Sequence, residues 1–150
     1  MQKILIIILI ILVCIIYIAS TKHINDDFTI IQLPLRSLTD DVILERNPIV
    51  ISDSIVDCEE FISITFRYMY IKKTNITPNA LFTINPYQYL IVHVKSDVNE
   101  VTVTHPKTGV STIIKLYPGN ILILPWQWKY NIKNKSIQLI GLHSLTTLFL

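Results

Sequence analysis

The chain has 150 residues, of which 51% are hydrophobic and 16% are charged. Its mean hydropathy of +0.47 is too high for an ordinary soluble domain and excludes a disordered chain. Behind the apolar N-terminal residues about 130 residues remain, enough for one compact domain and too few for a multidomain enzyme. With only two cysteines and three glycines, a disulfide scaffold and a glycine-rich phosphate loop are excluded as well.

Charge divides the remainder of the chain into two halves of opposite sign. Residues 20–66 carry nine acidic and three basic side chains, whereas residues 67–150 carry two acidic and nine basic ones. The basic residues are scattered singly, with Lys72 and Lys73 as the one adjacent pair. This spacing favours solvated outer faces of a sheet over a nucleic-acid surface, so we expect no nucleic-acid partner.

The N-terminal run from Ile4 to Ala19 contains no charge and no helix breaker. As a helix extended to Thr21 it reaches about 27 Å, against a hydrocarbon core of about 30 Å. Residues 1–21 are therefore predicted to be an uncleaved transmembrane signal-anchor helix that contacts a lipid bilayer through residues 4–21. Lys3 before the run places the N-terminus in the cytoplasm. A cleaved signal peptide and a buried core helix are the alternatives.

Residues 22–34 show no periodicity and are predicted to be a tether, and residues 35–150 are predicted to form the folded domain. A short acidic helix is expected at Leu38–Glu45 and a brief apolar strand at Ile49–Ile51. Asp57 followed by Glu60 is a capping box, which predicts an amphipathic helix over Cys58–Tyr70.

After Asn75 the sequence predicts only strands, because β-branched and aromatic residues alternate with polar ones between closely spaced turn signals. Hairpins are expected around residues 106–109 and 133–135, and the strand that is apolar on both faces, Ile121–Leu124, is expected to be central. The absence of alternating helices indicates an all-β sandwich or small barrel. The expected strands are Tyr89–Lys95, Glu100–His105, Val110–Leu116, Ile121–Leu124, Gln127–Ile132 and Ser136–His143.

Residues 118–134 resemble the second sequence motif of the cupins, the small jelly-roll barrels. Gly119, Pro125 and Asn134 stand at the motif's spacing, whereas Gln127 replaces its second glycine and Tyr130 its histidine. Two further segments, residues 116–120 and 45–51, are similar to the family's entry into this strand and to the opening of its Jumonji-C-like branch. The resemblance implies a small cupin-like antiparallel jelly-roll barrel with one short amphipathic helix, preceded by the transmembrane helix.

A complete cupin would hold a divalent metal with two histidines and an acid from its first motif and one histidine from its second. Residues 77–85, where the first ligands should lie, contain no histidine and no carboxylate, and Tyr130 stands at the last position. We therefore expect a degenerate barrel with no metal, no cofactor and no catalytic residue. The alternative is a metal held by unconventional ligands, namely His93, Glu100 and His105. Cys58 is expected to be an ordinary buried cysteine.

The barrel interior is the predicted binding site. If Tyr130 points inward, Trp126 and Trp128 share its face because side chains alternate along a strand. Together with Tyr89 and His93 they are the candidate interior residues. Two interpretations stay open, since the aromatic rings either fill the interior as a core or line a pocket that stacks a sugar or a base.

The predicted function is a membrane-anchored, non-catalytic cupin-like module for structural assembly or protein-partner binding. A composition rich in isoleucine, lysine and asparagine suggests an AT-rich genome, and the anchored barrel resembles membrane-associated proteins of large DNA viruses. That resemblance implies a virion component or a protein of a host membrane. The alternatives are a metal-dependent cupin oxygenase or isomerase and a carbohydrate-binding module; a small-molecule ligand is not indicated by the sequence.

Overall fold

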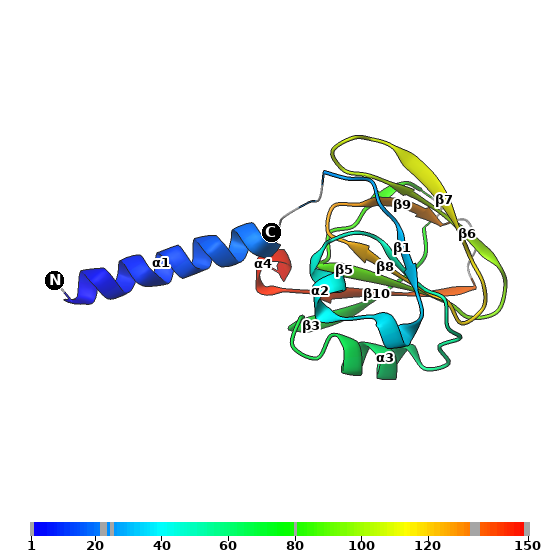
Figure 1. The fold of residues 1–150 in the computed structure, drawn as a ribbon, viewed down its shortest axis with the longest axis horizontal. Helices are drawn as coiled ribbons and strands as arrows, with labels where there is room; N and C mark the ends of the chain where they lie inside the picture. Colours follow the sequence, from blue (N-terminus) through cyan, green and yellow to red (C-terminus); the bar gives the residue numbers. More distant parts are fainter. Residues whose placement is uncertain (1, 22–23, 25, 80, 133–135, 149–150) are drawn as a thin grey trace.

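Two β-sheets lie face to face, and a long helix extends away from them (Figure 1). The computed structural model describes residues 2–21, 24, 26–79, 81–132 and 136–148, with only the backbone of residues 2, 3, 20 and 21. In chain order the helices are α1 (Gln2–Thr21), the 3-10 helix η1 (Leu35–Ser37), α2 (Asp40–Leu44), α3 (Cys58–Thr65) and α4 (Leu145–Leu148).

Sheet A has six strands in the order β1-β2-β8-β5-β10-β3, and sheet B has four in the order β4-β9-β6-β7. Sheet A contains β1 (Ile31–Leu33), β2 (Ile49–Ile51), β8 (Ile121–Pro125), β5 (Tyr89–Val94), β10 (Ile137–His143) and β3 (Lys72–Ile76). Sheet B contains β4 (Thr83–Ile84), β9 (Lys129–Ile132), β6 (Asn99–Thr104) and β7 (Ser111–Leu116). All pairs are antiparallel except β1 with β2, which run parallel.

The predicted hairpin around residues 106–109 is confirmed, because β6 pairs with β7 from Asn99↔Leu116 to Thr104↔Ser111. Gly109 closes its turn with a φ of 71°, a backbone conformation that favours glycine. The prediction of a second hairpin around residues 133–135 is wrong. Its turn lies outside the described residues, and its two strands separate, with β9 joining sheet B and β10 joining sheet A.

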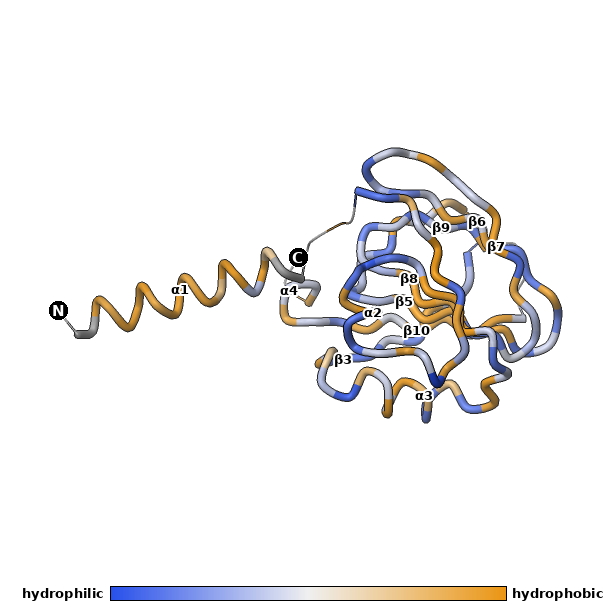
Figure 2. The backbone as a smooth tube through the Cα atoms, viewed as in Figure 1, coloured by the Kyte–Doolittle hydropathy of each residue, from blue (hydrophilic) through white to orange (hydrophobic). Residues whose placement is uncertain are grey.

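The central strands of sheet A are buried on both faces, and this explains why β8 is apolar along its whole length and β5 is apolar except at His93 (Figure 2). One face packs against sheet B and the other against α2 and α3. β8 lies between β2 and β5, so the prediction that Ile121–Leu124 is central is confirmed. The inter-sheet core contains Leu90, Val92, Val101, Val103, Leu122, Leu124, Trp128, Tyr130, Ile132 and Leu139, among others. The outer core contains Ile43, Ile49, Phe61, Ile62, Phe66, Tyr89, Ile91, Ile121, Ile123 and Leu142, among others.

Helix α3 begins where the capping box predicts it. The Asp57 carboxylate accepts hydrogen bonds from the backbone N–H groups of Glu59 (2.8 Å) and Glu60 (3.1 Å), two of the donors that a helix start leaves unpaired. The helix ends at Thr65 rather than at Tyr70, because Phe66 leaves helical geometry and buries its ring in the outer core.

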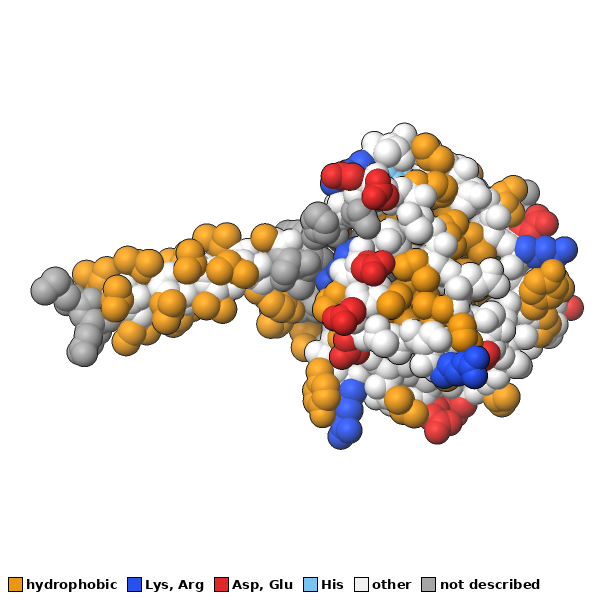
Figure 3. Space-filling model, in the orientation of Figure 1, with side chains coloured by type: hydrophobic (Ala, Val, Ile, Leu, Met, Phe, Trp, Pro, Cys, Tyr) orange, Lys and Arg blue, Asp and Glu red, His pale blue; other side chains and the backbone are white. Residues whose placement is uncertain are grey.

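Helix α1 projects from the domain, and the described side chains along it are apolar and 40–69% exposed (Figure 3). Within the part of the chain that the structure describes, no helix combines the length and apolarity needed to cross a membrane. The predicted transmembrane signal-anchor helix and the single-pass membrane location are therefore wrong. The uninterrupted apolar run of α1, Ile4–Ala19, spans about 24 Å as a helix, which is short of a hydrocarbon core of about 30 Å.

The all-β fold class with one short helix is also wrong, because 26% of the residues that the structure describes are in helices and 35% are in strands. Helices α2 and α3 lie within the helices predicted at Leu38–Glu45 and Cys58–Tyr70, and they cover the apolar outer face of sheet A. The helices η1 and α4 were not predicted. The expected tether also contains structure. Residues Ile31–Leu33 form β1 and pair with β2 at the edge of sheet A.

Candidate functional site

Three aromatic rings fill one end of the space between the sheets. Trp128 is 1% exposed, and the ring of Phe28 stacks on its indole with centroids 5.8 Å apart and an interplanar angle of 25°. The ring of His105, itself buried, meets the same indole edge-on at 5.0 Å. Phe28 and His105 also meet edge-on, with centroids 6.1 Å apart. These three residues occupy the interior that was predicted from the sequence as a binding site, and we call them the aromatic plug.

Phe28 reaches the aromatic plug from the segment that follows α1. That segment is held near the β6–β7 turn by Lys107, whose Nζ donates to the carbonyl of Ile24 at 2.9 Å and to Asp26 Oδ1 at 2.5 Å. Both charged groups are well exposed, so the ion pair contributes little, and the segment is held mainly by the packing of Phe28 and Ile30 on the inter-sheet core and by the pairing of β1 with β2. The N-terminal segment therefore closes this end of the domain from the same chain.

Tyr130 occupies the position where a cupin would carry its histidine ligand. It pairs across the sheet with Thr83 and Val103 and is buried in the inter-sheet core. Burial raises the pKa of its hydroxyl, and the nearby Tyr87 adds to the rise. A neutral phenol buried among aliphatic side chains is a core residue and a weak candidate for a metal ligand.

Asn85, which the sequence analysis did not single out, holds the turn that positions Trp128. Its side-chain nitrogen donates to the carbonyls of Leu124 (2.9 Å) and Pro125 (2.8 Å), and its backbone exchanges hydrogen bonds with Gln127 and Trp128. Gln127 adopts a φ of 66° in this turn. The position where the cupin motif has glycine thus adopts the backbone conformation that glycine favours.

The structure separates the predicted interior residues into two groups. Trp128 and Tyr130 lie between the sheets, whereas Tyr89 lies in the outer core, on the opposite face of sheet A. His93 follows it on that outer face, and its Nε2 lies 2.8 Å from the carbonyl oxygen of Ile55. Trp126 is half-buried in the turn after β8. The expectation that Tyr89 and His93 line the interior is therefore wrong, because β5 presents them to the face that the helices cover.

The alternative metal ligands His93, Glu100 and His105 do not converge. His93 lies outside sheet A, Glu100 is exposed on the outer face of sheet B, and His105 lies between the sheets. Nδ1 of His105 already accepts hydrogen bonds from the backbone N–H groups of Lys107 (3.3 Å) and Thr108 (3.1 Å). Among the described residues no group of three histidine, cysteine, aspartate or glutamate side chains could hold a metal ion.

A buried cation lies on the outer face of sheet A. Arg46 is 5% exposed, adopts a φ of 61°, and places its guanidinium 5.0 Å from the ring centroid of Tyr89. Burial lowers the pKa of Arg46 and raises that of Tyr89. With its amide oxygen toward Arg46, Gln88 accepts from Nη2 at 2.6 Å and donates to Ser144 Oγ at 3.0 Å. This network ties the segment before β2 to the start of β5 and the end of β10.

Cys58 is buried beneath α3, as expected. Burial raises its thiol pKa to about 12, and the neighbouring carboxylates of Glu59 and Asp57 add to the rise. A thiol that stays protonated at neutral pH is a poor nucleophile. Cys58 is therefore a packing residue.

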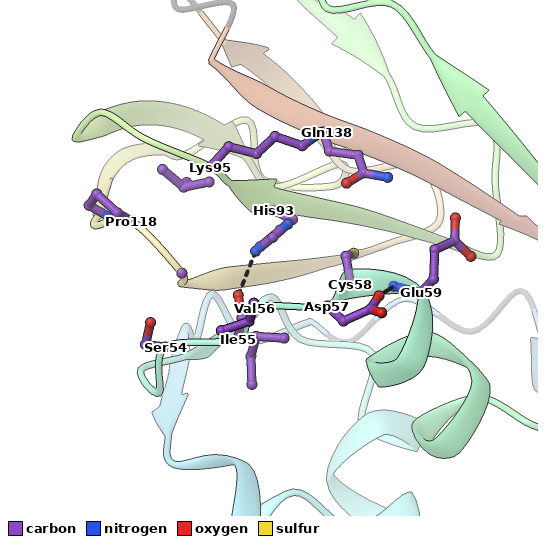
Figure 4. A pocket seen from close by; sticks show the side chains of 12 residues that line it. Ser54, Ile55, Val56, Asp57, Cys58, Glu59, His93, Lys95, Pro118 and Gln138 are labelled. Carbon is purple, nitrogen blue, oxygen red and sulfur yellow. Dashed lines mark hydrogen bonds between the residues drawn. The ribbon is translucent and has the colours of Figure 1, made fainter.

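A pocket of about 500 Å³ opens beside His93, between residues 54–59, the end of β5, the start of β10 and the turn at residues 118–119 (Figure 4). We call it the outer pocket. The side chains of Lys95 and Gln138 lie on one side, and those of Ser54 and Asp57 lie on the other. The pocket could not be predicted from the sequence because its walls come from segments distant in the chain. The one available signal was the alternation that places His93 and Lys95 on one face of β5.

Comparison of this chain with protein-family models, with curated proteins and with solved structures finds no match.

Proposed function

We propose that this chain is a non-catalytic, cupin-like module that acts in structural assembly through contacts between copies of itself. The observation that carries this proposal is the aromatic plug. Trp128, with Phe28 and His105 packed on it, takes up the interior where a cupin enzyme would need an open chamber for metal and substrate. An interior filled with rings leaves the outer surface as the functional part of the domain.

Two features support the cupin-like part of the proposal. The eight strands β3–β10 are divided equally between two facing sheets, as a jelly roll requires. At the two motif positions where cupins have glycine, Gly119 and Gln127, the backbone has φ values of 86° and 66°. A backbone that keeps the left-handed turn after losing its glycine is what a degenerate motif would leave behind.

The surface proposed for assembly is the free edge of β7. The other outer strands of the two sheets are protected or short: β3 carries Lys72 and Lys73, β1 has three residues and β4 has two. Strand β7 has six residues, and Ile113 at its centre is 63% exposed. A six-residue edge with a single charged side chain, Lys115 near its end, is a template for pairing with another strand.

A second copy of the same strand fits this edge. With the two β7 strands antiparallel about a two-fold axis at Ile113, the two isoleucines face each other and Thr112 faces Ile114. The one charged residue of the strand, Lys115, then faces Ser111 of the second copy, so no like charges are opposed. Two copies of sheet B would form one continuous sheet.

Sedimentation velocity of the full chain over a range of concentrations tests the assembly. We expect a reversible dimer that Ile113→Lys abolishes, because that change would place two ammonium groups opposite each other across the axis. Ile84→Lys is the matched control, since Ile84 is 55% exposed on β4 of the same sheet and lies outside the proposed contact. A parent chain that stays monomeric, or a dimer that survives Ile113→Lys, would refute self-assembly.

Elemental analysis of the same samples tests the non-catalytic part. We expect no stoichiometric iron, manganese or zinc. One tightly bound equivalent of any of them would overturn the proposal that the interior is a core.

A further inference from the structure

The outer pocket contains several polar groups with no partner among the described residues. Asp57 uses only Oδ1 to cap α3, which leaves Oδ2 open. The Lys95 ammonium and the Gln138 amide make no hydrogen bond or ion pair with the described part of the chain. The pocket therefore offers one anionic acceptor, one cationic donor and one neutral amide. Glu59, also in its wall, is already paired with Lys73.

His93 points to the kind of group that a ligand must bring. Its ring is 95% buried, and Nε2 lies 2.8 Å from the carbonyl oxygen of Ile55, so the proton is on Nε2. Nδ1 is then an acceptor, and it is buried with no partner among the described residues. A buried acceptor without a donor is costly, so a ligand that reaches it gains most by supplying an N–H or O–H donor.

We propose that the outer pocket binds a small zwitterion of amino-acid size. Its ammonium would donate to His93 Nδ1 and to Asp57 Oδ2, and its carboxylate would accept from Lys95, with Gln138 beside them. Figure 4 shows Lys95 and Gln138 on the β5 and β10 side and Asp57 at the start of α3, with His93 between them. Opposite charges on the two sides of the pocket favour a ligand that carries both charges over one that carries a single charge. About 500 Å³ is within the range of small-molecule sites.

This proposal is independent of the aromatic plug and of the β7 edge, because the pocket lies on the outer face of sheet A. Binding can therefore be measured whether or not the chain forms dimers.

Isothermal titration calorimetry of the full chain tests it with the standard L-amino acids, each titrated separately. We expect saturable binding of at least one. Its two analogues that lack either the amino or the carboxylate group should each bind at least about tenfold more weakly, because each loses one charge-assisted contact. No saturable binding by any amino acid, or equal binding of either analogue, would overturn the proposal.

Lys95→Gln tests the carboxylate contact without risk to the fold, since Lys95 is exposed. It should weaken binding about tenfold, whereas Lys129→Gln, the same change at an exposed lysine on the outer face of sheet B, should leave binding unchanged. When the ligand binds, the ¹⁵N chemical shift of His93 Nδ1 should change in the way that is typical of a ring nitrogen that begins to accept a hydrogen bond. Unchanged affinity in Lys95→Gln, or an unmoved Nδ1 resonance at saturation, would refute the assigned contacts.

Discussion

Truncating Trp128 to alanine should be among the most damaging single substitutions in this domain. The indole is 1% exposed and packs against Phe28 and His105 between the sheets. Replacing a buried tryptophan with alanine removes its transfer free energy and leaves a cavity, together about 3–5 kcal/mol. That loss is a large share of the about 5–15 kcal/mol by which a domain is stable. Trp128→Ala should therefore unfold at much lower urea concentration.

A double-mutant cycle with Phe28→Ala isolates the contact by which the N-terminal segment closes the domain. The stacked pair should give a coupling free energy of about 0.5–1.5 kcal/mol beyond the sum of the separate effects. Urea unfolding followed by circular dichroism supplies the four free energies. Tyr68→Ala, which truncates an aromatic ring that is 89% exposed, is the control and should stay within about 0.5 kcal/mol of the parent.

Two results would refute this reasoning. If Trp128→Ala costs less than about 1 kcal/mol, the interior is not the packed core that we describe. If the coupling is zero within error, Phe28 does not hold the segment against the aromatic plug, and the closure described above has another origin.

Three further predictions test local features. Asp57→Ala should destabilise the domain by about 1 kcal/mol in urea unfolding, because two N–H groups of α3 lose their acceptor, and Asp57→Asn should recover most of the loss. In the folded state the thiol pKa of Cys58 is raised from 9.0 to about 12, so the contribution of the buried thiol to stability is complete below pH 9 and is lost as the pH rises from 9 toward 12. In a plot of unfolding free energy against pH, Cys58→Ala should therefore flatten the part between pH 9 and 12. Gly119→Ala should cost about 1–3 kcal/mol, because φ is 86° and an added Cβ would lie 2.8 Å from the Cα of Ser54; an unchanged urea midpoint would contradict it.

Local sequence signals predicted two kinds of element: strands that bury only one face, and helices that begin with a capping side chain. β6 alternates buried Val101 and Val103 with the more exposed Glu100 and Thr102, so period two identified it. Helix α3 was predicted from its cap at Asp57. The position of Trp128 and Tyr130 between the sheets followed from the same alternation, although their role in binding stays a prediction.

The errors arose where both faces of an element are buried. On β5, Val92 faces sheet B and Ile91 faces the helices, so an apolar pattern could not say which face was interior, and Tyr89 and His93 were assigned to the wrong one. β10 has the same property, and its pairing with β3 and β5 instead of β9 had no local signal. The outer pocket was missed for the related reason that its walls come from four separate segments.

The sequence by itself located β2, β5–β10 and the start of α3, because alternation and capping depend on neighbouring side chains, whereas the short strands β1, β3 and β4 were not predicted. Only the tertiary structure decided which strands share a sheet, which face of β5 meets the helices, and that Phe28 closes the interior over Trp128. Those choices depend on contacts between residues far apart in the chain, whose free energies are set by which apolar faces can be covered together.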